Sequence, residues 1–267
     1  MGTALITGAS AGLGLEFAKL FAADKHDLVL VARRKDRLDE LATKLAADHQ
    51  VKVEVIAADL MAADASDKIL REVAERKLEI DFLVNNAGYG TTGRFVGSDV
   101  AKERGMIAVN VTALTELTRG VLPGMIARGR GRVLNISSTA AFQPGPFMAV
   151  YYASKAYVSS FSEALVYELK GTGVTVTVSC PGPTLTEFSQ VAGMEKSRLF
   201  AKGGAMSSVD VATQAYRAMH AGKVMIVHGF MNALSAFSVR FSPRWLVRAI
   251  AGTLNSGKDD GKPQLNA

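Results

Sequence analysis

The sequence predicts an α/β fold: a single-domain, doubly wound parallel sheet of about seven strands with helices on both faces. Short apolar runs rich in β-branched residues recur along the chain, and helical stretches separate them. This alternation favours right-handed crossovers between parallel strands. Runs such as Leu28–Ala32 are apolar at every position, which indicates a sheet covered on both sides.

Strands and helices are expected to alternate from the N-terminus. Ser242 is expected to be the N-cap of the last helix and Pro243 to lie in its first turn. Residues 255–267 are polar, and we expect them to be a disordered tail after a domain that spans residues 1–254. Strands are expected at Thr3–Thr7, Asp27–Ala32, Lys52–Ala57, Ile80–Val84, Arg132–Ile136, Val174–Ser179 and Val224–Val227. Helices are expected near residues 13–23, 35–48, 64–77, 99–128, 149–171, 208–221 and 243–254.

Composition limits the classes of protein to which the chain can belong. With 267 residues, 48% hydrophobic and 21% charged, it suits one large core better than two small ones. The single Cys180 excludes an internal disulfide framework, so we expect a reducing, cytoplasmic location. The formal net charge of +6 fits anionic cofactors, anionic membranes or nucleic acid without choosing among them. We expect no signal peptide and no membrane-spanning helix.

Three residues indicate acid–base chemistry: the hydroxyl of Ser138, the phenol of Tyr151 and the amine of Lys155. Lys155 follows Tyr151 by four residues, and residues with this spacing lie on the same helix face. A free phenol, with a pKa near ~10, is a poor proton donor or acceptor at neutral pH. A nearby ammonium in a partly dry site could supply the roughly 4 kcal/mol that a pKa near ~7 requires. The pair is therefore predicted to be a general acid/base.

Two neighbouring residues compete for these roles. Tyr152 could be the acid, but the helical spacing favours Tyr151, and we expect Tyr152 in the core or at a subunit interface. Ser137 competes with Ser138. The strand that is expected to end near Ile136 places Ser138 nearer the mouth of the pocket.

A glycine-rich turn, written TGASAGLG in one-letter code, follows the first strand and precedes a helical pattern. Gly8 permits a tight turn, Gly12 lets the backbone approach a pyrophosphate, and Gly14 lets the helix pack closely on the strand. The helix N-terminus offers free N–H groups and a positive dipole end to phosphate. Loop glycines are often plain turn formers, but this position directly after the first strand favours a dinucleotide site.

The same turn also spells G-x-S-x-G, the nucleophile elbow of α/β-hydrolases, with Ser10 as the nucleophile. A hydrolase needs an acid and then a histidine downstream, and the candidates are Asp210 followed by His220 or His228. It also needs an oxyanion-hole strand before the elbow, whereas this elbow follows the very first strand. The serine hydrolase is therefore the third-ranked function.

The glycine spacing has the form T-G-x-x-x-G-x-G, and with it the chain resembles the short-chain dehydrogenase/reductase (SDR) family, most of all its bacterial ketoacyl- and ketosteroid-reductase-like branch. The resemblance continues through Asn85-Asn86-Ala87-Gly88, Asn110, Ser138, Tyr151-x-x-x-Lys155 and Pro181-Gly182. The motifs occur in the family's order, and the ordered set is far more specific than any single motif. The resemblance implies a Rossmann fold, a homodimer or homotetramer, and hydride transfer between a nicotinamide and a carbonyl or secondary alcohol.

The resemblance also implies a role for each motif. Tyr151 would exchange the proton of the substrate hydroxyl, Ser138 would hold the substrate oxygen, and Lys155 would lower the pKa of the phenol and bind the nicotinamide ribose. Asn110 would anchor a water that links the lysine to solvent, although an isolated helical Asn is usually solvated. No metal ion is expected. The residues expected to bind the cofactor are Gly8, Ser10, Gly12, Leu13, Gly14, Arg33, Arg34, Asp59, Leu60, Asn86, Ala87, Gly88, Tyr151, Lys155, Pro181, Gly182, Thr184 and Thr186.

The expected cofactor is NADP(H), with NAD(H) as the less favoured alternative. NAD-binding proteins of this type place an Asp or Glu about 20 residues past the glycines, where it holds the ribose 2′-hydroxyl. Here the second strand ends in Ala32-Arg33-Arg34-Lys35, and two guanidinium groups suit a 2′-phosphate. Asp59, which closes the third strand, would lie beside the adenine or act as an N-cap.

Two apolar clusters favour a lipophilic carbonyl or alcohol substrate, because methionine adapts to irregular apolar ligands. One cluster lies between Ser138 and Tyr151, and the other occupies the region of the family's flexible substrate lid. Both could instead be core. Their members are Phe142, Pro144, Phe147, Met148, Phe188, Met194, Leu199 and Phe200.

Residues 230–254 form a basic amphipathic segment, with Arg244 and Arg248 on one face and Leu246, Ile250 and Leu254 on another. Such a segment most often packs on its own domain or on a partner subunit, and the alternative is a weak contact with a membrane surface. A nucleic-acid partner is not expected.

A non-catalytic dinucleotide-binding redox sensor or scaffold is the alternative function from another class. An intact Ser138, Tyr151 and Lys155 set speaks against it, because binding alone needs no acid/base phenol.

Overall fold

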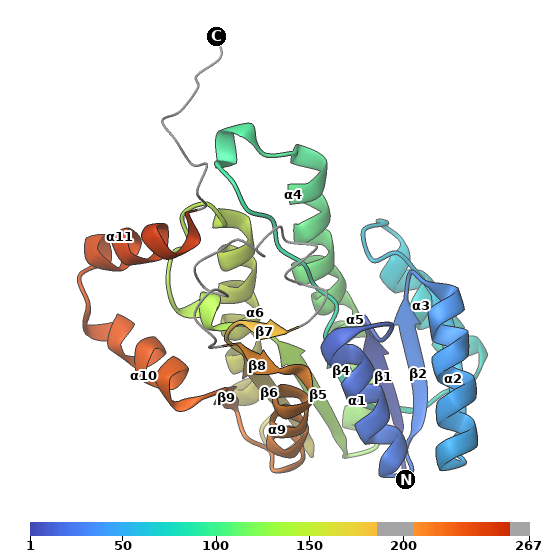
Figure 1. Ribbon diagram of the computed structural model, residues 1–267. Helices are drawn as coiled ribbons and strands as arrows, with labels where there is room; N and C mark the ends of the chain where they lie inside the picture. Colours follow the sequence, from blue (N-terminus) through green and yellow to red (C-terminus); the bar gives the residue numbers. More distant parts are fainter. Residues whose placement is uncertain (186–204, 257–267) are drawn as a thin grey trace.

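A parallel sheet of seven strands forms the centre of the structure, a computed structural model that describes residues 1–185 and 205–256 (Figure 1). The strand order is β3-β2-β1-β4-β5-β6-β9, and each neighbouring pair is parallel. The order reverses at β1, which lies between β2 and β4. The doubly wound sheet that the sequence predicts is therefore confirmed.

Each expected strand is present, and the expected helices lie within a few residues of their predicted bounds or are divided as described below. The strands are β1 (Thr3–Thr7), β2 (Asp27–Ala32), β3 (Val53–Ala57), β4 (Ile80–Asn85), β5 (Gly131–Ile136), β6 (Val174–Cys180), β7 (Thr184–Leu185), β8 (Met206–Ser207) and β9 (Met225–Val227). The helices are α1 (Gly12–Ala23), α2 (Lys35–His49), α3 (Ala65–Glu75), α4 (Val100–Ile107), α5 (Leu114–Ala127), α6 (Ala149–Glu168), α9 (Ser208–His220), α10 (Phe230–Ser238) and α11 (Arg244–Asn255).

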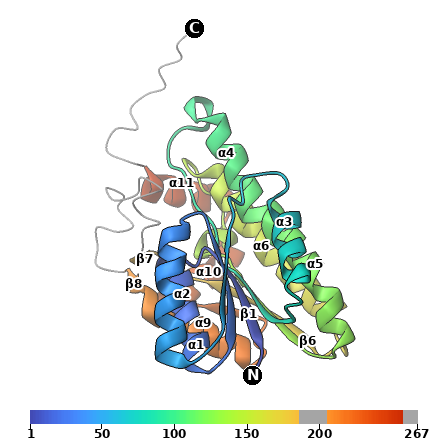
Figure 2. The ribbon, with the colours of Figure 1, turned by 90° about the vertical axis from the view of Figure 1, so that its right-hand side faces the viewer.

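Two layers of helices cover the sheet, with α1, α2 and α9 on one face and α3, α5 and α6 on the other (Figure 2). Strand β1 shows why both layers form, because successive side chains of a strand point to opposite faces. Ile6 packs in one core with Phe17 of α1, whereas Leu5 packs in the other with Ile69 of α3. All of these side chains are fully buried, and each such burial stabilises the fold by roughly 1.5–3 kcal/mol.

The single helix expected at residues 99–128 is divided into three parts. Asp99 caps α4, because its carboxylate accepts a hydrogen bond from the backbone N–H of Ala101 (2.9 Å). Residues Ala108–Ala113 then form a wider π-helical turn before α5 begins. Such turns are rare and frequently occur at functional sites. Here the turn holds Asn110.

The C-terminal region differs most from expectation. Helix α10 was not expected as a separate element, and neither was the short parallel ribbon of β7 and β8. Helix α10 follows Gly229 (φ 85°) without a side-chain N-cap, so it lacks the usual sequence signal for a helix start. Asn255 was expected in a disordered tail but is the last residue of α11 and is buried. The rest of that predicted tail, from residue 257, lies outside the described residues.

Among the helices of residues 1–185 and 205–256, none is both long enough and apolar enough to cross a bilayer.

Candidate active site

A cleft of about 940 Å³ follows the carboxyl ends of the strands. In an open α/β sheet, ligands bind at this edge where the strand order reverses, and here that point is β1. Most of the predicted cofactor residues line the cleft: Gly8, Ser10, Gly12, Leu13, Arg33, Arg34, Asp59, Leu60, Asn86, Ala87, Gly88, Tyr151, Lys155, Pro181 and Thr184. Gly14 and Gly182 do not contribute to its lining, and Thr186 lies outside the described residues.

The glycine turn has the shape that a dinucleotide phosphate requires. Gly8 and Gly12 adopt positive φ values of 68° and 55°, which glycine reaches without strain. A Cβ on Gly14 would collide with the carbonyl of Gly8, so α1 can approach the turn closely only with glycine there. The turn therefore lies close to the start of α1, and its residues Gly8 to Leu13, except the buried Ala9, line the cleft. This cradle fits the pyrophosphate of a nicotinamide dinucleotide.

Thr7 organises the floor of the cleft, a role that the sequence did not suggest. Its buried Oγ1 accepts hydrogen bonds from the backbone N–H groups of Asn86 and Ala87 (both 3.0 Å). The side chain of Asn86 donates in return to the carbonyl of Thr7 (2.9 Å). These bonds join the ends of β1 and β4. The only sequence signal for this role is the position of Thr7 directly before Gly8.

Ser10 and Arg34 are linked across the cleft mouth. Nε and Nη2 of Arg34 donate to Oγ of Ser10 at 3.3 and 3.0 Å. The hydroxyl therefore holds the guanidinium beside the glycine turn, and Arg33 lines the same cleft. Asp59 accepts from the backbone N–H of Met61 (3.0 Å), so it closes a local turn and does not cap α3, which begins six residues later at Ala65.

Tyr151 and Lys155 both lie on the buried face of α6, 8% and 4% exposed. Nζ of Lys155 lies 5.8 Å from the centroid of the Tyr151 ring and donates to the carbonyl of Ile136 (2.9 Å). The Tyr151 side chain is hydrogen-bonded to Ser138. Tyr151 and Lys155 line the cleft, whereas Ser138 does not contribute to the lining and reaches the site through Tyr151. Oγ of Ser138 also donates to the carbonyl of Pro181 (3.4 Å) and accepts from the backbone N–H of Ala140 (3.1 Å).

The pKa of Tyr151 is raised, whereas the sequence predicts that it is lowered. Burial raises it to about 12, and the hydrogen bond with Ser138 offsets only part of that rise. Burial also lowers the pKa of Lys155 to about 8. Both shifts have one cause, since a dry site disfavours whichever form is charged. In the protein without cofactor, the phenol is therefore fully protonated at neutral pH.

The competing residues have other partners. Oγ of Ser137 bonds to the carbonyl of Lys155 and to Oγ of Ser159 (both 2.8 Å), so it links the end of β5 to α6. Ser137 nevertheless lines the cleft and Ser138 does not, so the expectation that Ser138 lies nearer the mouth of the pocket is wrong. Tyr152, which was expected in the core or at a subunit interface, is buried and bonds to Asn255 (3.1 Å), so it lies in the core.

Asn110 is almost fully buried (1% exposed) and binds both backbone groups of Tyr89. Its Nδ2 donates to the Tyr89 carbonyl and to Oγ of Ser154 (both 3.0 Å), and its Oδ1 accepts from the Tyr89 N–H (3.1 Å). A Cβ on Gly88 would lie 3.1 Å from Oδ1 of Asn110 and 3.3 Å from Nζ of Lys155. The three groups thus converge, and the water relay stays a prediction.

The residues of the hydrolase alternative are not assembled into a triad. Ser10 accepts from Arg34, Asp210 accepts from Ser207 (2.7 Å), and His228 is held between Ser179 and Gln214 (2.8 and 3.1 Å). His220 packs on the ring of Tyr216, with 4.3 Å between the ring centroids. Within residues 1–185 and 205–256, no hydrogen bond joins Ser10 to a histidine.

The expected substrate pocket is only partly described. Met148 packs with Tyr151 in a small core cluster, and Arg94 lies over the ring of Phe147 at 5.6 Å. Tyr89, Thr91 and other residues after β4 also line the cleft, although no sequence motif marks them. Outside the described residues lie Phe188, Met194, Leu199 and Phe200.

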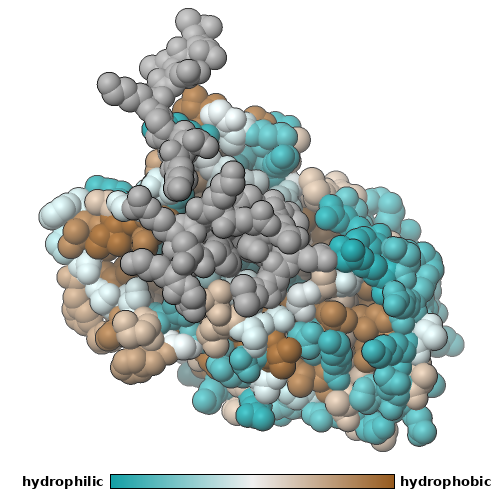
Figure 3. All heavy atoms as spheres, viewed as in Figure 1, coloured by the Kyte–Doolittle hydropathy of each residue, from teal (hydrophilic) through white to brown (hydrophobic). Residues whose placement is uncertain are grey.

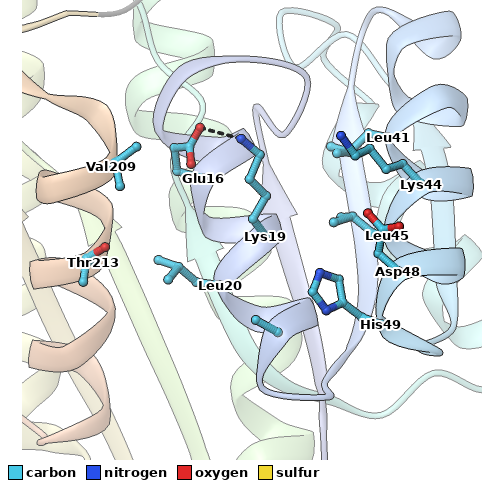
Figure 4. Close-up of a pocket in the computed structure, with 11 residues that line it drawn as sticks. Glu16, Lys19, Leu20, Leu41, Lys44, Leu45, Asp48, His49, Val209 and Thr213 are labelled. Carbon is cyan, nitrogen blue, oxygen red and sulfur yellow. Dashed lines mark hydrogen bonds and ion pairs between the residues drawn. The ribbon is translucent and has the colours of Figure 1, made fainter.

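A second hollow, of about 370 Å³, lies between α1, α2 and α9 on the outside of one helical layer (Figure 4). Leu20, Leu41 and Leu45 line it together with charged residues that include the Lys19–Glu16 ion pair (2.9 Å). None of the predicted site residues contributes to it.

Comparisons with known proteins agree with this geometry. A family model described as short chain dehydrogenase matches residues 2–196. The very-long-chain 3-oxoacyl-CoA reductase of Bos taurus is 34% identical over 192 residues, which cover 70% of this chain and 61% of that protein. The chain spans only 60% to 62% of the length of this and two other curated relatives.

Two solved structures share the whole fold. A short-chain dehydrogenase from Sphingobium yanoikuyae, in complex with NADPH, is 33% identical with a TM-score of 0.80, and the match covers 90% of this chain and 94% of that one. The bulky-bulky ketone specific alcohol dehydrogenase from Comamonas testosteroni is 30% identical with a TM-score of 0.77, over 90% and 92% of the two chains.

Proposed function

Because this chain belongs to the short-chain dehydrogenase family, we propose that it is an NADP(H)-dependent oxidoreductase acting on a carbonyl or secondary alcohol. It transfers a hydride between the nicotinamide and the substrate carbon, with Tyr151 as the general acid/base. One observation carries the proposal: Tyr151 and Lys155 line the same cleft as the glycine turn, and Ser138 is hydrogen-bonded to Tyr151.

The chemistry assigns a part to each of these residues. When bound, the nicotinamide supplies or accepts the hydride. In the reductive direction the phenol of Tyr151 donates its proton to the oxygen of the former carbonyl. Burial raises the pKa of this phenol, which opposes the transfer, so the nearby ammonium of Lys155 has to favour the phenolate. Ser138 is hydrogen-bonded to the same phenol, and its hydroxyl would hold the substrate oxygen beside it. The ammonium of Lys155 offsets the negative charge that then remains on the tyrosine.

The preference for NADP(H) rests on the end of β2. Arg33 and Arg34 line the cleft there, where an NAD-binding protein has a carboxylate. Ser10 holds the Arg34 guanidinium in place, which lowers the entropy lost when it binds a phosphate. The Sphingobium relative in complex with NADPH supports the same choice.

A lipophilic substrate is the further part of the proposal. Met148, Phe147 and Tyr89 lie around the catalytic tyrosine or its loop. The relatives act, by their names, on very-long-chain 3-oxoacyl-CoA and on bulky ketones. From the family resemblance we also propose a homodimer or homotetramer in a reducing cytoplasmic setting, and light scattering after size exclusion tests that assembly.

The proposal is tested by following NADPH oxidation with a panel of ketones, aldehydes and acyl thioesters. Tyr151→Phe should lower turnover by roughly 10²–10⁴-fold, the usual contribution of general acid–base catalysis, while NADPH binding persists. Tyr157→Phe is the matched control, because Tyr157 lies on the same helix but is 39% exposed. Full turnover in Tyr151→Phe would refute the assignment, and ester hydrolysis without NADPH that is lost in Ser10→Ala would favour the hydrolase.

A further inference from the structure

We propose that α10 and α11 form a docking surface for an anionic membrane. In this docking surface, exposed apolar side chains enter the lipid–water interface and arginines meet the headgroups. The surface comprises Phe230, Leu234, Phe237, Arg240, Phe241, Arg244, Trp245, Leu246, Arg248 and Ile250.

Helix α10 and the turn after it present their apolar side to solvent. Phe230, Leu234, Phe237 and Phe241 recur at spacings of four, three and four residues, which places them on one helical stripe. They are 80%, 49%, 57% and 75% exposed, whereas Ala236 is the one buried residue of the helix. A surface helix of a globular protein normally turns its apolar stripe inward. This orientation therefore leaves the apolar stripe open to a partner.

Helix α11 has an apolar side toward the domain and another toward solvent. Val247, Ala251 and Asn255 are buried, while Trp245 and Ile250 are 64% and 53% exposed. Figure 3 shows hydrophobic side chains gathered over both helices, at the end of the molecule beyond β9. Large contiguous apolar patches are rare on monomeric soluble proteins and mark protein or membrane contacts.

The charge of this surface favours an anionic membrane over a second copy of the chain as the partner. From residue 211 to residue 258 the sequence contains no Asp or Glu, and Arg240, Arg244 and Arg248 are all exposed. In a two-fold dimer through this face, the arginines of both copies would come together without a carboxylate from either helix pair. Anionic lipid attracts each arginine. Aromatic residues such as Trp245 also favour the membrane interface.

Helices α10 and α11 contact loops that lie next to the active site. Nδ2 of Asn232 in α10 donates to the carbonyl of His228 (2.8 Å), and the same side chain packs against Gly182. Gly252 of α11 lies against Pro146, in the loop that precedes the catalytic tyrosine. A bilayer bound to α10 and α11 would therefore lie beside the loops of the cleft.

Trp245 can serve as an intrinsic fluorescence probe of membrane binding, because it is the only tryptophan of the chain. The full-length protein is mixed with vesicles of phosphatidylcholine alone and of phosphatidylcholine with phosphatidylglycerol. We expect it to sediment with the anionic vesicles, and the Trp245 emission to shift to shorter wavelength and become quenchable by brominated lipid. Unchanged emission without sedimentation overturns the proposal. Equal binding to both vesicle types overturns the role of the arginines.

Variants separate the two contributions. Replacing Arg240, Arg244 and Arg248 by Gln should lower the partition coefficient roughly a hundredfold, whereas the same change at the exposed Lys44, Arg71 and Arg104 should change it much less. Phe237→Ser with Phe241→Ser should lower it roughly ten- to a hundredfold. Phe95→Ser with Val96→Ser, at exposed apolar sites elsewhere, is the control. Wild-type binding by the Phe237/Phe241 variant refutes the docking surface.

A second copy of the chain is the competing occupant. If the wild type shows a dimer that Phe237→Ser with Phe241→Ser dissociates, and no vesicle binding, the face is a subunit interface and the proposal fails. Circular dichroism and NADPH binding establish that each variant is folded. The result is independent of turnover, so failure of the docking surface and failure of the proposed function are distinguishable.

Discussion

The hydroxyl of Tyr152 donates a hydrogen bond of 3.1 Å to Oδ1 of Asn255, the last residue of α11. Nδ2 of Asn255 donates in turn to the carbonyl of Pro146 (3.1 Å). Tyr152 directly follows Tyr151, and Pro146 belongs to the loop between Ser138 and Tyr151. One buried amide therefore joins the C-terminal helix to both sides of the proposed proton donor.

Replacing Asn255 by Ala should destabilise the protein by about 1–3 kcal/mol, because the variant leaves buried polar groups without a partner. It should also lower kcat/KM, since the loop before Tyr151 loses its attachment. Urea unfolding and steady-state kinetics measure the two effects. Thr253→Ala, on the exposed side of the same helix, is the matched control and should stay within about 0.5 kcal/mol of wild type. Equal stability of both variants would contradict the structural role of the amide.

Arg34→Ala should reduce kcat/KM with NADPH by roughly 10- to 100-fold and leave the value with NADH nearly unchanged. The expected loss is that of a hydrogen bond to a charged group, about 1.5–3 kcal/mol. Ser10→Ala should have a smaller effect in the same direction, because it removes only the group that holds the guanidinium. Lys35→Ala is the control, since Lys35 is exposed and pairs with Asp39. A preference of the unmutated protein for NADH would overturn the cofactor assignment.

Carbonyl reduction should slow as the pH rises through about 8. Burial lowers the pKa of Lys155 to about 8, so the ammonium is present below that pH and is lost above it. The pKa of Tyr151 is raised to about 12, so the phenol remains a donor throughout this range. The kcat/KM for NADPH reports groups of the free enzyme. A profile that stays level well above pH 8 would show that the charge of Lys155 is not required.

Local patterns are sufficient to predict the sheet and most of the cleft. The apolar strand runs, the glycine turn after β1 and the spacing of Tyr151 and Lys155 all act between residues close together in the chain. These features follow from backbone geometry and helix periodicity, which a single sequence displays directly. Arg33 and Arg34 reach the cleft for the same reason, because they follow β2 immediately.

Features that depend on distant contacts are the ones that the sequence does not show. The amide of Asn110 binds the backbone of Tyr89, 21 residues away, and Asn255 is held by Tyr152 across 103 residues. The pKa of Tyr151 differs from expectation because burial outweighs its hydrogen bond with Ser138, and burial is a property of the whole fold. The outward face of α10 likewise contradicts the usual rule for amphipathic helices.

His228 should make the folded state sensitive to mild acid. Its ring is buried between Ser179 and Gln214, and burial lowers its pKa to about 4 from the ordinary 6.5. Above pH 6.5 the ring is neutral in both the folded and the unfolded chain, so this stability is fully present. As the pH falls from 6.5 toward 4, the unfolded chain binds a proton that the folded chain does not, and up to about 3 kcal/mol is lost.

Urea unfolding at several pH values between neutrality and 4 measures this loss. In His228→Gln the free energy of unfolding should depend less on pH over that interval, even if its value at neutral pH is lower. His49→Gln, at the end of α2, should keep the wild-type dependence and is the matched control. If His228→Gln and the wild type lose stability in parallel as the pH falls, other groups are responsible, and the buried ring is not the acid-sensitive element.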